Sequence, residues 1–256
     1  MAAPTGSLEA PPPLRERAGR GRGPAGRRAD QRLSLLRSAA LIAAKDLRIE
    51  ARSRVATSQV LPFGGIVLLL AAFAIDPGRA ALAGVAPGMF WTAVLLAAVL
   101  AAGRSAQLEV AGGTGDGLRL SWLDPGGVFL GKVAAIFVEL LLLEAALLAV
   151  LIAVYGFRVS HPLLLVASAV SATAGISSVG VLYGAVAAAL RTRETLLPLL
   201  ALPVLTPEAL GGTQAWTAVQ QADPGDGLRW LQLLTLFACV LLSAGIAAYG
   251  ALLEEE

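Results

Sequence analysis

Cysteine and histidine are almost absent from this chain, which has one of each among 256 residues. That count rules out a disulfide framework, a zinc cluster and a CxxCH haem-attachment sequence. Charged residues are also few, at 15%, whereas about a quarter of a soluble domain is charged. Because 56% of the residues are hydrophobic and the mean hydropathy is +0.72, the composition indicates an integral membrane protein.

A phosphate-binding loop of the form GxxxxGK[ST] is also missing, since the single Gly-Lys pair, Gly131-Lys132, is followed by Val133. Without backbone amides to cradle phosphates and a hydroxyl to bind magnesium, we expect no ATP hydrolysis by this chain. The sole histidine, His161, precedes a proline at a loop end, which favours a solvent-exposed residue over an axial haem ligand or a proton acceptor. We therefore expect no catalytic residue, no metal site and no nucleic-acid partner.

The N-terminal segment 1–31 is rich in proline, glycine, alanine and arginine and has no apolar periodicity. Such a composition cannot bury enough surface to fold, so we expect a disordered basic tail. No apolar stretch follows its arginines closely, which argues against a cleavable signal peptide.

Residues 32–58 have the pattern of an amphipathic helix at the cytoplasmic surface or in the membrane interface. A broad apolar row recurs every three or four residues and comprises Leu33, Leu36, Ala40, Ala44, Leu47, Ala51 and Val55. A narrower apolar row lies roughly opposite and consists of Leu35, Ile42 and Ile49. A basic row, Lys45, Arg48 and Arg52, runs along one side. Such a helix either lies in the interface and contacts a second surface, or is a plain anchor.

Six apolar segments follow within 59–256, near 60–75, 85–102, 128–155, 162–190, 195–210 and 228–252. Since a span needs about 20 residues, we expect a permease domain of six transmembrane helices. The fifth is expected to be kinked or incomplete, because it contains Pro198, Pro203 and Pro207. All Lys and Arg residues except Arg79, Arg158 and Arg229 then lie on one side, so the positive-inside rule makes both termini cytoplasmic.

Two acidic residues, Glu139 and Glu144, lie inside the third segment, where a charged carboxylate costs at least about 2.5 kcal/mol. They are roughly 140° apart around a helix and so do not share one face. Either they hydrogen-bond to serine and threonine of the fourth segment, or they take part in transport or gating. The fourth segment itself contains two rows of small residues, formed by Ser171 with Gly175 and by Gly180 with Gly184. These rows predict tight helix packing, within the bundle or across a homodimer.

Four stretches resemble the CcmB family, the membrane permeases of cytochrome c maturation. They are KDLRIEARSR at 45–54, APGMFWTAVLLAAVLAAGRS at 86–105, FLGK at 129–132 and RTRETLLPLLALPVLTP at 191–207. The resemblance covers about residues 40–256 and implies an ABC-2-type permease bundle in the bacterial cytoplasmic membrane. It also implies a CcmA-like ATPase partner, CcmC-like and CcmD-like membrane partners, and a CcmE-like haem chaperone. Haem would then be a transported or handled substrate, and ATP would act through the partner subunit.

Within this resemblance, the long hydrophilic break from Arg104 to Lys132 is the first place to look for ATPase docking. Four glycines in the stretch 111–117 argue against a continuous helix there, since each costs about 1 kcal/mol in a helix. The helix before the first span and the turn after the fourth are expected to share the contact. The candidate coupling residues are Lys45, Arg48, Arg52, Glu109, Arg119, Trp122, Arg191, Arg193 and Glu194.

Other functions remain open from the residues alone. An ABC-2-type export permease for a lipid or drug would have the same architecture and the same lack of a phosphate loop. A proton-coupled secondary transporter would use Glu139 and Glu144. A membrane scaffold would transport nothing.

Overall fold

The computed structural model describes the backbone of residues 24–53, 56–74, 79–112, 124–190 and 196–254. Side chains are described for 35–53, 58–74, 81–101, 124–186 and 201–250. The helices are α1 (Pro24–Ser53), a short π-helix η1 (Ala56–Val60), α2 (Leu61–Ala74), α3 (Arg79–Gly112), α5 (Pro125–Tyr155), α6 (Pro162–Leu190), α7 (Leu196–Val219) and α8 (Gly225–Glu254). These described ranges contain no strand, so the predicted all-α class is confirmed.

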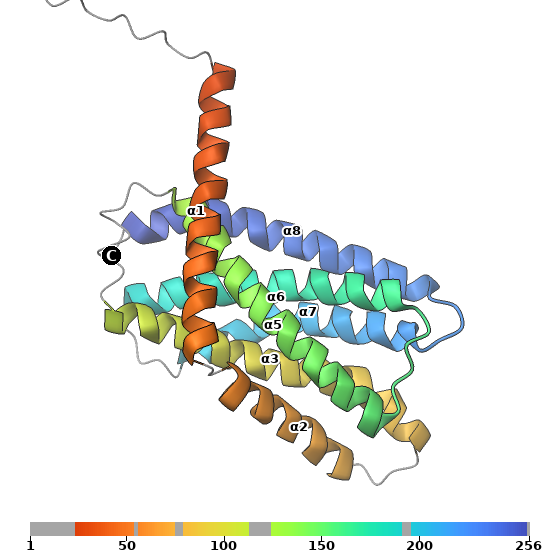
Figure 1. Ribbon diagram of the computed structural model, residues 1–256. Coiled ribbons are helices and arrows are strands. Elements are labelled where there is room, and N and C mark those ends of the chain that lie inside the picture. The colour runs from red at the N-terminus through yellow and green to blue at the C-terminus, as the bar shows by residue number, and fades with distance from the viewer. Residues whose placement is uncertain (1–23, 54–55, 75–78, 113–123, 191–195, 255–256) are drawn as a thin grey trace, which may run out of the picture.

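The long helices lie side by side as a bundle in which α6 is the central element (Figure 1). Helix α6 contacts α3, α5, α7 and α8, while α2 packs on α3 and α5 along one flank. Helix α1 runs across the bundle instead of along it and packs on α5. Helix α1 crosses one end of the bundle, and the α5–α6 and α7–α8 connections lie at the opposite end.

Four helical stretches in the described residues are long and apolar enough to cross a membrane: Ala81–Ala101, Pro125–Tyr155, Pro162–Val186 and Gly225–Gly250. A fifth crossing results if Leu35–Ser53 and Ser58–Ala74 are counted as one bent span. Helix α2 alone has 14 residues, which is short for a bilayer. Length and composition thus identify a multi-pass helical body, and they leave the expected count of six as a prediction.

The helix bounds agree with the expected segments most closely at α6, which covers the expected 162–190. Helix α1 begins at Pro24, inside the segment for which no fold was expected. Helix α3 continues ten residues beyond the expected end of the second span, to Gly112. The helix therefore continues past the point at which the apolar run ends.

Helix α7 is one continuous helix from Leu196 to Val219, so the prolines do not interrupt it, and the predicted kink stays a prediction. Pro198 lies in the first turn, where a missing N–H breaks no intrahelical bond. Pro203 and Pro207 are four residues apart and both are exposed, so they share one outer face. Their rings point away from the bundle, and the packed face of α7 keeps its contacts.

Buried aromatic rings join α3, α7 and the start of the α5–α6 connection. Trp216 of α7 stacks on Phe90 of α3 with ring centroids 4.2 Å apart, and it contacts Trp91 and Phe157 at 5.6 Å. All four rings are almost fully buried. This cluster holds α7 against α3 near the end of the bundle that lies opposite α1.

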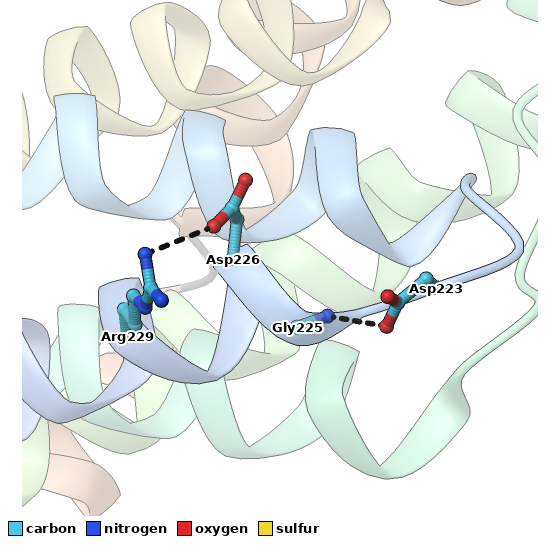
Figure 2. A network of polar contacts seen from close by, with 4 residues as sticks. All are labelled: Asp223, Gly225, Asp226 and Arg229. Carbon is cyan, nitrogen blue, oxygen red and sulfur yellow. Dashed lines mark hydrogen bonds and ion pairs between the residues drawn. The ribbon is translucent and has the colours of Figure 1, made fainter.

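Local polar contacts organise that same end of the bundle. The N–H of Ser160 donates to the carbonyl of Val219, and the ring of His161 lies 3.1 Å from the carbonyl of Gln221. Figure 2 shows the start of α8, where the N–H of Gly225 donates to Asp223 and Arg229 pairs with Asp226 at 3.5 Å. The sole histidine thus links the α5–α6 connection to the end of α7.

Candidate functional site

The contact between α1 and α5 is built on two glycines, Gly127 and Gly131. A Cβ atom at Gly127 would lie 2.6 Å from the carbonyl oxygen of Leu35 and 2.7 Å from Cβ of Ser38. A Cβ atom at Gly131 would lie 2.6 Å from the carbonyl oxygen of Ala39. These distances are too short for any side chain, so glycine lets the two backbones touch, as small residues do in close helix crossings. Asp124 caps the start of α5 by accepting a hydrogen bond from the N–H of Gly127 at 2.9 Å.

The face of α1 that makes this contact carries Leu35 and Ile42 of the narrow apolar row, whereas Ile49 of that row is 45% exposed. Ile42 is buried against Gly131, and Leu35 contacts Gly126 and Gly127. In the broad row, Leu36 is 63% exposed, and Ala40 and Ala44 are exposed as well. Helix α1 therefore contacts the bundle on one side and keeps an apolar surface free on the other.

A buried lysine lies at the joint between α1 and α5. Lys132 follows Gly131 on α5 and is only 5% exposed. Asp46 of α1 attracts its charge, whereas Lys45 repels it. Lys45 in turn forms an ion pair with Asp46 at 2.9 Å. Burial disfavours the charge of Lys132 more than Asp46 favours it, so close packing at the glycines is what holds α1 against α5.

The basic row proposed for ATPase coupling lies on the exposed part of α1. Lys45, Arg48 and Arg52 are all exposed. Glu109 lies in the last turns of α3, and its side chain is outside the described residues, as are Arg119, Trp122, Arg191, Arg193 and Glu194.

The helix ends that border those coupling segments gather at one end of the bundle. The end of α3, the start of α5, the end of α6 and the start of α7 all lie at the end marked by α1 (Figure 1). The end of α8 lies there too. Helices that run alternately up and down produce this grouping, which matches the side on which the basic residues concentrate.

Of the two expected intramembrane acids, only Glu144 is fully inside the bundle. The hydroxyl of Thr173 on α6 donates to its Oε1 at 2.6 Å and also lies 2.7 Å from the carbonyl of Ala169. Oε2 of Glu144 has no hydrogen-bond partner among the described residues. Glu139 is half-buried and makes its own polar contact. Glu144 thus hydrogen-bonds to the fourth span, one of the two alternatives that the sequence left open.

The small residues of α6 have different neighbours from one another. Ser171 forms a hydrogen bond with Thr235 of α8, with 3.1 Å between their hydroxyls. Gly180 and Gly184 are half-buried. Gly175 lies directly against the carboxyl group of Glu208 on α7. Here the missing side chain makes room for a carboxyl group and not for a helix backbone.

Sequence reasoning did not single out Glu208, which is the most buried acid of the structure as described. Its exposed fraction is 0%, and neither oxygen has a hydrogen-bond partner among the described residues. The signal was present, because an acidic residue directly after Pro207 in an apolar segment is as unusual as Glu139 or Glu144. For this stretch the prolines predicted only a kinked or incomplete helix.

Comparison with known proteins identifies a family for this chain. Residues 37–254 match the family described as CcmB protein. Heme exporter protein B of Paracoccus denitrificans is 31% identical over 209 residues, which are 80% of this chain and 94% of that protein. Heme exporter protein B of Pseudomonas aeruginosa is 31% identical over 212 residues, or 81% of this chain and 94% of the relative.

The match begins inside α1 and ends in the last turn of α8, so it includes the α1–α5 joint and every bundle helix. The resemblance drawn from four short stretches is therefore confirmed over almost the whole folded body. This chain belongs to the CcmB family.

Proposed function

We propose that this chain is the membrane permease subunit of an ABC-type system for cytochrome c maturation, handling haem export or the release of a haem-loaded chaperone. The observation that carries the proposal is the family match over 37–254, together with relatives named heme exporter protein B. The division of labour fits the sequence, which has no phosphate loop of its own. A CcmA-like ATPase would supply hydrolysis, with CcmC-like, CcmD-like and CcmE-like proteins as further partners.

The coupling route we propose starts at the exposed basic row of α1. The ATPase would contact Lys45, Arg48 and Arg52, together with the segments around Glu109, Arg119, Trp122 and Arg191–Glu194. Because Gly127 and Gly131 bring α1 into backbone contact with α5, a shift of α1 cannot be absorbed by side-chain rearrangement alone. Force on α1 would therefore reach α5 and the Glu144–Thr173 contact with α6.

For the topology, we propose six crossings of the bacterial cytoplasmic membrane with both termini in the cytoplasm. Four stretches are long and apolar enough to cross a membrane, and helices α2 and α7 would be the fifth and sixth crossings. The proposed division is a basic segment at 1–31, the last residues of which belong to the start of α1, an interfacial helix at 32–58 and a permease domain at 59–256. Support for the interfacial helix comes from α1, which runs across the bundle with its broad apolar row exposed.

Co-purification tests the proposed function directly. The full chain, tagged and extracted in mild detergent, is expected to retain an ATPase and a CcmC-like protein, and a strain lacking the chain should lose cytochrome c assembly. A triple variant, Lys45→Glu with Arg48→Glu and Arg52→Glu, tests the proposed contact surface. Compared with the unchanged chain, it should insert into the membrane normally but retain less of the ATPase. Normal cytochrome c assembly without the chain would refute the proposal and favour an export permease for a lipid or drug. Function that persists without any ATPase would favour a proton-coupled transporter.

A further inference from the structure

Glu208 lies in a buried position where an ionised carboxylate would carry a large free-energy cost. A Cβ atom on Gly175, near the middle of α6, would overlap its Oε1 and would lie 2.6 Å from its Cδ. The carboxyl group thus fills the space that a side chain at position 175 would take. It is completely buried, and both of its oxygens lack hydrogen-bond partners among the described residues.

Among the side chains that the structure describes on α3, α6 and α8, no cation pairs with it. Helix α6 contains no Lys, Arg, His, Asp or Glu, and α3 contains none between Ala81 and Ala101. Helix α8 packs Leu234 on Gly211 beside this site, and its described charged residues, Asp226 and Arg229, are exposed at its far end. The other titratable groups of these helices are Arg79, Arg104 and Glu109 of α3, Tyr183 of α6, and Cys239, Tyr249 and Glu254 of α8.

Two further buried polar groups lie along the same side of α7, one from α3 and one from α7 itself. Gly212, one turn or about 6 Å along the helix, lies against the indole of Trp91, and Trp216 follows one turn later. The indole N–H groups of Trp91 and Trp216 have no acceptor among the described residues. Apolar side chains would pack these helices without leaving a polar group unpaired. Each indole N–H group that is buried without an acceptor carries a free-energy cost.

We propose that Glu208 is an internal proton-binding site, neutral while α7 is packed on α6 at Gly175 and ionised when the two helices separate and admit water. On separation the O–H bond of the carboxylic acid breaks, its electron pair stays on the carboxylate oxygen, and the proton passes to water. On closure the reverse transfer occurs. The site deepens the proposed function, because it would make rearrangement of the permease proton-linked, but its resting state is independent of that function.

Infrared spectroscopy of the purified full chain in nanodiscs tests the resting state. A protonated carboxylic C=O band that disappears in Glu208→Gln, and is distinct from the band lost in Glu144→Gln, is expected at neutral pH. A Glu208 that is already ionised at neutral pH would overturn the proposal. This measurement needs no partner protein, so failure of the proposed function would not affect it.

A matched glycine pair tests whether the band depends on the space beside Gly175. In Gly175→Ala the added methyl overlaps Oε1 of Glu208, so the carboxyl group must leave this space, either by rotation of the flexible Glu208 side chain or by movement of α7, and the carboxylic band should shift or be lost at neutral pH. Gly65→Ala, where a Cβ meets nothing within 4 Å, should leave the band unchanged. If Gly175→Ala does not fold, the packing contact itself is tested by Gly175→Ala combined with Glu208→Ala, which should fold because the overlapping carboxyl group is gone. A Gly175→Ala chain that folds and keeps the Glu208 band, or a double variant that also fails to fold, refutes the proposal.

Activity separates this inference from the function on which it rests. Glu208→Gln keeps the size and neutrality of the packed group, so normal abundance is expected with cytochrome c assembly lowered several-fold. Unchanged assembly in Glu208→Gln would show that the proton plays no part in the cycle. Assembly that is normal even without the chain would refute the proposed function instead, and would leave the infrared result standing.

Discussion

Individual glycines in this bundle differ sharply in what surrounds them. Gly212 lies under the buried indole of Trp91, whose Cδ2 would be 2.7 Å from an added Cβ, whereas Gly65 and Gly84 face open space. All three are helical glycines in the same apolar body, and hydropathy treats them alike. Their mutational effects should differ in sign.

Gly212→Ala is expected to destabilise the protein by roughly 1–3 kcal/mol, because a fully buried Trp91 has nowhere to move. Gly84→Ala should instead be neutral or stabilising by up to about 1 kcal/mol through its better helix propensity. Thermal unfolding of the detergent-solubilised variants, followed by intrinsic tryptophan fluorescence, measures both. Equal midpoints for the two variants would contradict the close contact at Gly212.

A hydroxyl donor at Thr173 satisfies one oxygen of Glu144. Thr173→Val should destabilise by about 1–3 kcal/mol, since it leaves a buried acceptor without its donor. Thr206→Val is the matched control, because that hydroxyl is exposed and bonds only to the carbonyl of Leu202 in its own helix. A Thr173→Val chain as stable as Thr206→Val would mean that the bond to Glu144 contributes little.

Among the elements, α1 and α5 form the pair whose relative position matters most for the proposed coupling. Their contact uses backbone atoms at Gly127 and Gly131, so even one methyl group must displace α1. Helix α2 packs on α5 differently. A Cβ atom added at Gly64 would lie 3.2 Å from Cδ1 of Leu147, the end of a flexible side chain, and the hydroxyl of Tyr155 donates to the carbonyl of Leu68 at 2.7 Å. The α1–α5 joint is therefore the less tolerant of the two.

Gly131→Ala is expected to insert into the membrane normally but to lower cytochrome c assembly by an order of magnitude or more, because α1 is shifted relative to α5. The measurement is haem-stained c-type cytochrome per amount of inserted chain. Gly64→Ala provides a comparison on the other flank and should retain most assembly. Full assembly in Gly131→Ala would show that α1 does not transmit force through this crossing.

In the whole molecule, successive bundle helices run in opposite directions, so their connections lie at two opposite ends (Figure 1). The proposed topology predicts that a cysteine at Lys45 is labelled only from the cytoplasm and one at Arg158 only from outside, in a background where Cys239 is replaced by serine. Both positions are exposed, and replacing the single native cysteine, Cys239, leaves the introduced thiol as the one site for labelling. Labelling of both sites from the same side would refute the topology.

Charge reversals at the α1 end should reduce function without reducing protein abundance. Glu109→Lys and Arg193→Glu are each expected to lower cytochrome c assembly, because both lie in segments proposed to meet the ATPase. Arg229→Glu, at the opposite end, serves as the control and should leave assembly near normal. Normal assembly in Glu109→Lys and Arg193→Glu would remove these segments from the coupling surface.

The sequence alone determined the helical class, the membrane setting, the family and most helix positions, because hydropathy runs and local motifs depend on neighbours along the chain. It also located Glu144, since a charge in an apolar run is visible without any fold. Only the tertiary structure decided which row of α1 packs, which glycines are indispensable, and that Glu208 occupies the space beside Gly175. Those facts depend on atoms from different helices lying within contact distance, and no local pattern specifies which helices will meet.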